Sequence, residues 1–205
     1  MIALIKMNLK QKNMTKINEI DFYALQNEAY RCACYHGFHE KKMSDETYLM
    51  LVITELSEAV EADRRGKRAN IEKSKIDRLL EPKRLIEDEL PFIRSFERNI
   101  KDTIEDELAD AVIRLLDLAG VNCMHISIPS LEIDHESEIN ITDMIYYIIS
   151  EYIANKSIYL PVKISYSIAY IFAISETILN VDLMQFINLK MSYNRLRPYL
   201  HNKKY

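Results

Sequence analysis

The chain has 205 residues, of which 48% are hydrophobic and 28% charged, a balance typical of a globular protein that buries its own core. Its net charge of −4 excludes a global positive field for nucleic acid, and its three glycines exclude a P-loop or a dinucleotide-binding fingerprint. Three cysteines at no metal-ligand spacing, with an opening too short for a signal peptide, predict reduced thiols and a cytoplasmic location.

Hydrophobic residues recur every three or four positions along most of the chain, so we predict a single all-α domain over residues 1–205. After a ragged start over residues 1–15, the expected helices cover 17–36, 48–66, 98–119, 142–155, 161–179 and 182–196. Three of these runs are followed by a glycine, where a helix end favours a left-handed residue: Gly37, Gly66 and Gly120. The expected capping or first-turn residues at the other ends are Ser44 or Asp45, Thr142, Pro161 and Asp182.

Two segments depart from this regular pattern. The span 67–97 is charged and contains Pro82 and Pro91, so we expect an insertion or flexible flap rather than core. The last residues, 190–205, form a basic tail with interleaved tyrosines, which favours packing over the disorder that is common at chain ends.

Two of the predicted helices each carry a pair of carboxylates three residues apart, which places both on one side of the helix. The pairs are Glu55 with Glu58 and Glu107 with Asp110. One such pair is common on solvated faces, but two of them beside apolar stripes predict a shared site. Oxygen ligands on rigid elements suit Mg²⁺ or Mn²⁺, so we expect these residues to hold a divalent cation. Most of the neighbouring carboxylates are expected to be solvated, with one of them a candidate outer ligand: Glu61, Glu105, Asp106 and Asp117.

The basic tail is the natural complement of such a site, because lysine and arginine donate to the oxygens of metal-bound phosphates. Lys190 and Asn194 lie one helical turn apart and face the same side. Two rival metal patterns are weaker. A ferritin-like site needs two Glu-x-x-His units on helices, and the single one, Glu132 with His135, lies in a predicted loop. His36 and His39 straddle a glycine and are interpreted as structural or substrate-facing.

With these residues in place, the chain resembles the all-α nucleoside triphosphate pyrophosphatase superfamily, specifically the MazG-like nucleotide pyrophosphohydrolases and the related dimeric dUTPases. The signature of that superfamily is an E-x-x-E helix followed by an E-x-x-D helix, matched here by Glu55, Glu58, Glu107 and Asp110. The stretches ELSEAVEADRRGKRA, EDELADAVIRLLDLAG and KMSYNRLRPYLHNKKY are similar as well. The resemblance therefore covers residues 20–68, 98–120 and the C-terminal end.

The resemblance implies a four-helix core that holds Mg²⁺ and is completed in a homodimer or higher homo-oligomer. Enzymes of this kind cleave a nucleoside triphosphate between its α and β phosphates and release the monophosphate and pyrophosphate, in some cases as house-cleaning. The implied metal ligands and catalytic residues are Glu55, Glu58, Glu107 and Asp110. The implied substrate-binding residues are Lys190, Asn194, Arg197, Lys203, Lys204, Gln26 and His39.

Two features depart from the superfamily pattern and leave the substrate open. The stretch between the two motifs is longer than usual, and the chain lacks a tryptophan near the base site, where Phe38 and His39 stand instead. Two other functions compete with the enzyme. One is a non-catalytic helical partner module that keeps the fold. The other is a binder of nucleic acid or membrane surfaces through the basic tail, against which the net negative charge argues.

Overall fold

The structure is a computed structural model that describes residues 15–71, 89–131 and 140–202. Within these ranges every regular element is helical, which confirms the predicted all-α class. The seven α-helices of the described residues are α1 Phe22–Tyr35, α2 Asp45–Arg64, α4 Glu89–Asn99, α5 Ile104–Val121, α6 Ile141–Tyr147, α7 Leu160–Thr177 and α8 Leu183–Arg195. A π-helix, Ile148–Ile153, continues α6, and 3₁₀ turns cover Ile17–Glu19 and Tyr199–Asn202. None of the helices described is both long and apolar enough to cross a membrane.

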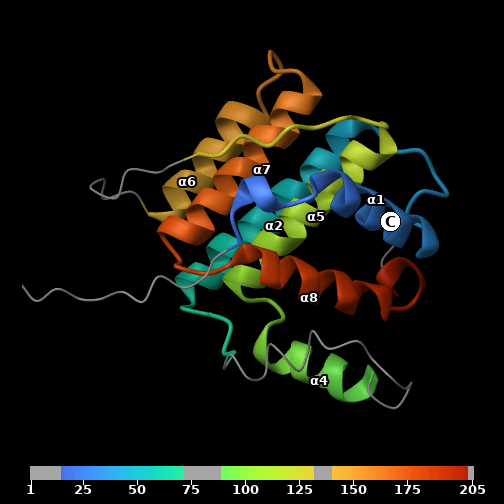
Figure 1. Ribbon diagram of the computed structural model, residues 1–205, viewed down its shortest axis with the longest axis vertical. Coiled ribbons are helices and arrows are strands. Elements are labelled where there is room, and N and C mark those ends of the chain that lie inside the picture. Colours follow the sequence, from blue (N-terminus) through green and yellow to red (C-terminus); the bar gives the residue numbers. More distant parts are fainter. Residues whose placement is uncertain (1–14, 72–88, 132–139, 203–205) are drawn as a thin grey trace, which may run out of the picture.

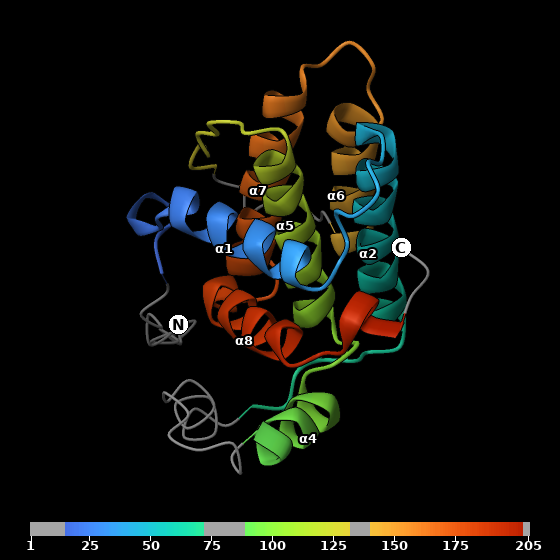
Figure 2. The same cartoon turned by 90° about the vertical axis from the view of Figure 1, so that its right-hand side faces the viewer.

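Helix α5 lies at the centre of the fold and contacts α1, α2, α7 and α8. In Figure 2, α2, α5, α6 and α7 run side by side while α1 and α8 cross them, and Figure 1 shows α4 beyond α8. Leu108, Val112 and Leu115 of α5 are fully buried. Each such side chain stabilises the fold by about 1.5–3 kcal/mol relative to an exposed position. The burial of α5 on several sides fixes the positions of the polar residues that it also carries.

Three of the four predicted capping or first-turn positions are confirmed, whereas the helices predicted from residues 17 and 98 begin later, at Phe22 and Ile104. Ser44 and Asp182 cap α2 and α8 with their side chains, and Pro161 stands in the first turn of α7. The prediction for α6 was wrong, because Asn140 and not Thr142 is its capping residue. The Asn140 side chain accepts a backbone N–H three residues further on at 2.8 Å, and asparagine is the stronger N-cap of the two.

The glycines show two different roles. Gly37 and Gly66 have φ angles of +80° and +62° and end α1 and α2 as predicted. The prediction for Gly120 was wrong, because α5 continues past it and the left-handed residue is Cys123, with φ +50°. A Cβ atom at Gly120 would lie 2.6 Å from the Cβ of Tyr30. The glycine is therefore required for the close approach of α1 to α5 rather than for a helix end.

The expectation that 67–97 lies outside the core was wrong for its last part, which forms most of α4. Phe96 is fully buried, and its ring stacks on that of Tyr193 in α8 with centroids 4.3 Å apart. Phe92, one turn earlier, is also buried. Residues 72–88 of the same span lie outside the described ranges.

Phe96→Ala is expected to lower the free energy of unfolding by about 3–5 kcal/mol, because truncation of a buried aromatic ring leaves a cavity. Urea unfolding measures the change. The matched control is Leu90→Ala in the same helix, where a side chain that is 61% exposed predicts a change within about 0.5 kcal/mol. A loss of stability in Phe96→Ala as small as that in Leu90→Ala would show that Phe96 contributes nothing to the core.

Candidate metal centre and adjoining cavity

Three of the four predicted metal ligands converge between α2 and α5. Glu55 and Glu58 of α2 and Glu107 of α5 each offer a carboxylate oxygen within 4.8 Å of the other two. Glu55 and Glu107 are buried and Glu58 is exposed, so the cluster opens to solvent on one side. The three-residue spacing on α2 and the direct packing of α2 on α5 bring these oxygens together.

The cluster holds more negative charge than its protein neighbours balance. Burial, followed by the nearby carboxylates of Asp106, Asp110 and Glu55, raises the pKa of Glu107 to about 9. Burial and Asp110 also raise the pKa of Glu55. The carboxylates disfavour one another's ionisation, so a positive charge between them would be stabilising. Three carboxylate oxygens in this arrangement fit a hard divalent cation such as Mg²⁺ or Mn²⁺.

Asp110, the fourth predicted ligand, is engaged elsewhere. The Lys190 Nζ atom lies 2.8 Å from Asp110 Oδ2 and 2.8 Å from Asp106 Oδ1. Burial disfavours ionisation of Asp110, but Lys190 and Arg114 more than offset it and lower the pKa of this carboxyl. Asp110 therefore lies beside the three-glutamate cluster with its charge already compensated, and its role as a ligand stays a prediction.

The basic tail divides into three parts. Residues 190–195 are not tail but the last turns of α8, where Lys190 is buried in its two ion pairs and does not face solvent. Asn194 and Arg197 reach the cavity described below. Lys203 and Lys204 lie outside the described residues.

Arg114 is a site residue that the sequence reasoning missed. Its Nε atom lies 2.5 Å from Glu55 Oε1, and its side chain also lines the cavity. The available signal was its spacing, four residues after Asp110 and three before Asp117, which places all three on one face of α5. A guanidinium carries five N–H donors, so the pair with Glu55 leaves donors for a further anion.

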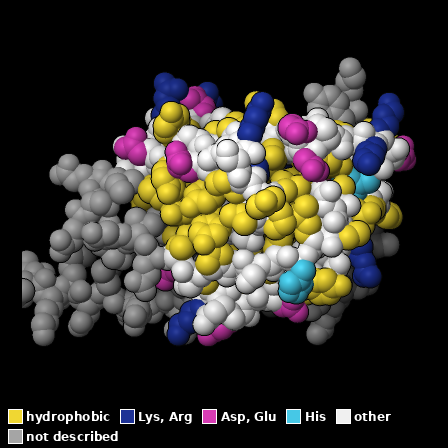
Figure 3. Space-filling model, turned by 90° about the horizontal axis from the view of Figure 1, so that it is seen from above, with side chains coloured by type: hydrophobic (Ala, Val, Ile, Leu, Met, Phe, Trp, Pro, Cys, Tyr) yellow, Lys and Arg dark blue, Asp and Glu magenta, His cyan; other side chains and the backbone are white. Residues whose placement is uncertain are grey.

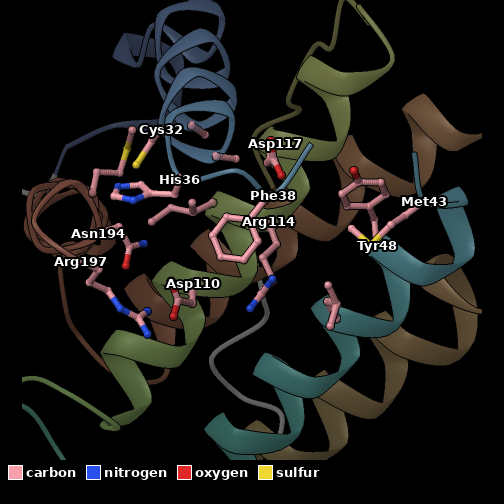
Figure 4. Close-up of a pocket in the computed structure, with 15 residues that line it drawn as sticks. Cys32, His36, Phe38, Met43, Tyr48, Asp110, Arg114, Asp117, Asn194 and Arg197 are labelled. Atoms are coloured by element: carbon pink, nitrogen blue, oxygen red, sulfur yellow. The ribbon is translucent and has the colours of Figure 1, made fainter. Parts of the chain in front are cut away.

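A cavity of about 100 Å³ opens between α1, α2, α5 and α8 next to the acidic cluster. Asp110 and Arg114 line it on the side of the cluster, and Arg114 joins the two through its ion pair with Glu55. In Figure 4 the ring of Phe38 lies in the middle of the lining, with Asp110 on one side and Asp117 on the other. The cavity thus has an acidic, metal-compatible end and a second polar end, separated by an aromatic ring.

Neither of the two residues predicted to contact the base, His39 and Gln26, lines the cavity. His39 lies behind the cavity wall, with Nε2 2.8 Å from Asp117 Oδ1 and Nδ1 3.0 Å from the Tyr48 hydroxyl, both of which belong to lining residues. Gln26 is buried and donates to the carbonyl of Met124 at 2.9 Å, and the structure does not bring it into the lining.

The expectation that the neighbouring carboxylates are solvated was wrong for most of them. Glu105 is buried and accepts from Arg68 at 2.7 Å, Asp106 is buried against Lys190, and Asp117 is paired with His39. Glu61 alone among them forms surface ion pairs, with Arg64 and Arg65.

Comparisons of this chain with protein-family models, with curated proteins and with solved structures found no match. The function must therefore be inferred from the chemistry of the acidic cluster and the cavity beside it.

Proposed function

We propose that the protein is a Mg²⁺-dependent nucleoside triphosphate pyrophosphohydrolase of the MazG-like kind, which cleaves between the α and β phosphates and releases the monophosphate and pyrophosphate. The observation that supports it most is the convergence of Glu55, Glu58 and Glu107 within 4.8 Å, beside a cavity that Arg114 connects to them. A cation site next to a cavity with an aromatic ring suits a substrate that is anionic at one end and apolar and planar at the other.

The carboxylates of Glu55, Glu58 and Glu107 would hold the cation, with Asp110 next to them. Bound Mg²⁺ supplies Lewis acidity and neutralises phosphate charge, which is the main demand of phosphoryl-group hydrolysis. Glu58 is the exposed member of the cluster, so it faces the solvent that supplies the attacking water and is placed to orient it.

The remaining residues of the site bind and position the substrate. Arg114 has N–H donors left for phosphate oxygens at the border between cluster and cavity, and Arg197 adds a second guanidinium on the cavity wall. Asn194 is buried in the lining, and its Oδ1 atom has no hydrogen-bond partner among the described residues. This orphaned acceptor is suited to a hydroxyl of the pentose. The Phe38 ring offers a face on which a base can stack.

The test is pyrophosphate release from a panel of canonical and modified triphosphates, with Mg²⁺ or with EDTA. We expect release with Mg²⁺ only, and a loss of at least about 100-fold in Glu58→Gln, because a ligand carboxylate is replaced by a neutral amide. Glu61→Gln, which removes a carboxylate one turn away on the same helix, is the matched control and should retain activity. Release that persists in EDTA or in Glu58→Gln would remove the cluster from the reaction.

The expected homodimer or higher homo-oligomer stays a prediction. Figure 3 shows hydrophobic side chains gathered over one face of the molecule, and large side chains such as Tyr146 and Tyr159 are 72% and 83% exposed. Exposed apolar areas of this kind are typical of protein interfaces, so they support an oligomer and also the competing non-catalytic partner module. Metal-dependent pyrophosphate release separates the proposed enzyme from the partner module, because the module would show none.

A further inference from the structure

The end of the cavity away from the acidic cluster contains a hydrogen-bonded relay that the proposed reaction does not use. His39 bridges Asp117 and Tyr48, with Nε2 2.8 Å from Asp117 Oδ1 and Nδ1 3.0 Å from the Tyr48 hydroxyl. Its ring also stacks on that of Tyr30, with centroids 5.2 Å apart and planes at 27°. The three side chains are mostly buried, so the relay holds the Asp117 carboxylate in one orientation at the cavity wall.

The relay determines which groups face a ligand. A carboxylate only accepts, so His39 donates through Nε2–H to Asp117, and the neutral ring then accepts at Nδ1 from the hydroxyl of Tyr48. Burial, and then the charge of Asp117, raises the pKa of Tyr48 to about 12, so its hydroxyl keeps the proton that it donates. The groups that are left to accept a hydrogen bond from a ligand in the cavity are the second oxygen of Asp117 and the hydroxyl oxygen of Tyr48.

The position of Asp117 suits contact with the nucleobase of a substrate rather than with its phosphates. Asp110, Arg114 and Asp117 share one face of α5, and seven residues of helix rise about 10 Å. Arg114 and Asp110 mark the end beside the metal centre, so Asp117 lies two turns away, beyond the Phe38 ring in Figure 4. A second anionic group at this end would repel phosphate, whereas a planar base stacked on Phe38 would direct its edge toward Asp117.

We propose that Asp117, oriented by His39 and Tyr48, reads the edge of the base and selects nucleotides with an exocyclic amino group, such as cytosine or adenine, over their keto counterparts. This inference rests on the proposed function. An amino group donates N–H to the free oxygen of Asp117. A carbonyl oxygen at the same place would face a carboxylate oxygen, two acceptors with no proton between them. The second oxygen of this mostly buried carboxylate would then have no donor.

The experiment compares two pairs of substrates that differ at this group, CTP with UTP and ATP with the inosine nucleotide ITP. In the wild-type protein with Mg²⁺, kcat/KM should favour the amino member of each pair by at least about tenfold. Asp117→Asn keeps an oxygen for His39 and adds an N–H donor, so the preference should fall to within about twofold or reverse. A preference for the amino member in only one of the two pairs would show whether a pyrimidine or a purine is the natural ligand.

Two further variants separate base reading from folding and charge. Tyr48→Phe keeps the ring and removes the hydroxyl that helps to orient Asp117 through His39, so it should lower the preference less than Asp117→Asn does. Asp143→Asn removes the same charge from an exposed position on α6, which contributes nothing to the cavity lining, and should leave the preference unchanged.

Calorimetric binding of CMP, UMP, AMP and IMP gives a readout that needs no turnover. Equal affinities or equal kcat/KM values for amino and keto members in the wild type would overturn the proposal, as would an unchanged preference in Asp117→Asn. Absence of pyrophosphate release from all four triphosphates would overturn the proposed function instead, and the monophosphate affinities would still decide the base preference.

Discussion

Glu107→Gln is expected to stabilise the fold at neutral pH while it removes metal-dependent turnover. Burial, followed by the neighbouring carboxylates, raises the pKa of Glu107 from 4.5 to about 9. The unfolded chain loses this proton above about pH 4.5 and the folded protein keeps it up to about pH 9, so unfolding releases a proton between these values. The free energy of unfolding of the wild type therefore falls as pH rises through this window, by on the order of 3 kcal/mol at about pH 7.

Urea unfolding in EDTA, at about pH 5 and about pH 8, measures this difference, and the variant should gain little at the lower pH and much more at the higher. Glu61→Gln on the surface of α2 is the control and should show no such pH dependence. An equal effect of Glu107→Gln at both pH values would mean that the Glu107 carboxyl is not held protonated by its surroundings.

The same substitution tests the cation site directly. A cation that binds only the folded state raises the melting temperature, so Mg²⁺ should stabilise the wild type. Glu107→Gln should lose most of this shift and at least about 100-fold of the pyrophosphate release, because it removes one of the three carboxylates that would bind the cation. A Mg²⁺ shift of unchanged size in the variant would place the cation elsewhere.

The acidic pairs could be predicted from the sequence because they depend on local geometry. Residues three apart on a helix share a side, so the pairs on α2 and α5 follow from their spacing once both segments are helical. The convergence of Glu107 with the α2 pair needs only that the two helices pack against each other through their apolar stripes, as they do. The caps at Ser44 and Asp182 were predictable for the same local reason.

Helix α4 and the end of α5 could not be predicted in this way. Pro91 suggests a break, but it is the third residue of α4, where the first turn has no intrahelical use for its missing N–H. Gly120 has the position of a helix end, yet its role depends on Tyr30, a residue of another helix. A residue that satisfies a tertiary contact carries no local signal to distinguish it from a terminator.

The polar partners of the site are likewise tertiary. Lys190 is 84 residues from Asp106 in the sequence, and His39 is 78 residues from Asp117. Lysine and aspartate are exposed by default, so spacing on their own helices cannot show that they are buried together. Only the packing of α8 and of the segment after α1 onto α5 reveals that these charges are compensated.

Lys190→Met is expected to lower the free energy of unfolding by about 3–5 kcal/mol, because it removes the counter-charge from the buried carboxylate of Asp106 and the partly buried one of Asp110. The Lys190 side chain is 6% exposed and lies 2.8 Å from both Asp106 and Asp110, whereas methionine fills a similar volume without charge. Urea unfolding measures the loss. Lys101→Met is the matched control, because its ion pair with Asp102 is at the surface and is worth at most about 1 kcal/mol.

A second substitution separates loss of charge balance from loss of packing. In the double variant Lys190→Met with Asp106→Asn, one of the two uncompensated charges is removed, so part of the lost stability should return. Burial, against the opposing charge of Lys190, already raises the pKa of Asp106 to about 6, which makes it the carboxyl that neutralises at least cost. A double variant no more stable than Lys190→Met alone would assign the effect to packing.

The same variants decide between the structural and the phosphate-binding roles of Lys190. A lysine that binds substrate phosphate must leave Asp106 and Asp110. Its departure would leave the buried Asp106 and the partly buried Asp110 without this counter-charge, unless a cation replaces the lysine at Asp110. If Lys190 is structural, the folded fraction of Lys190→Met should bind triphosphate in Mg²⁺ as the wild type does. A fall in triphosphate affinity of at least about tenfold, with stability no lower than in Lys101→Met, would show instead that Lys190 exchanges its carboxylates for phosphate.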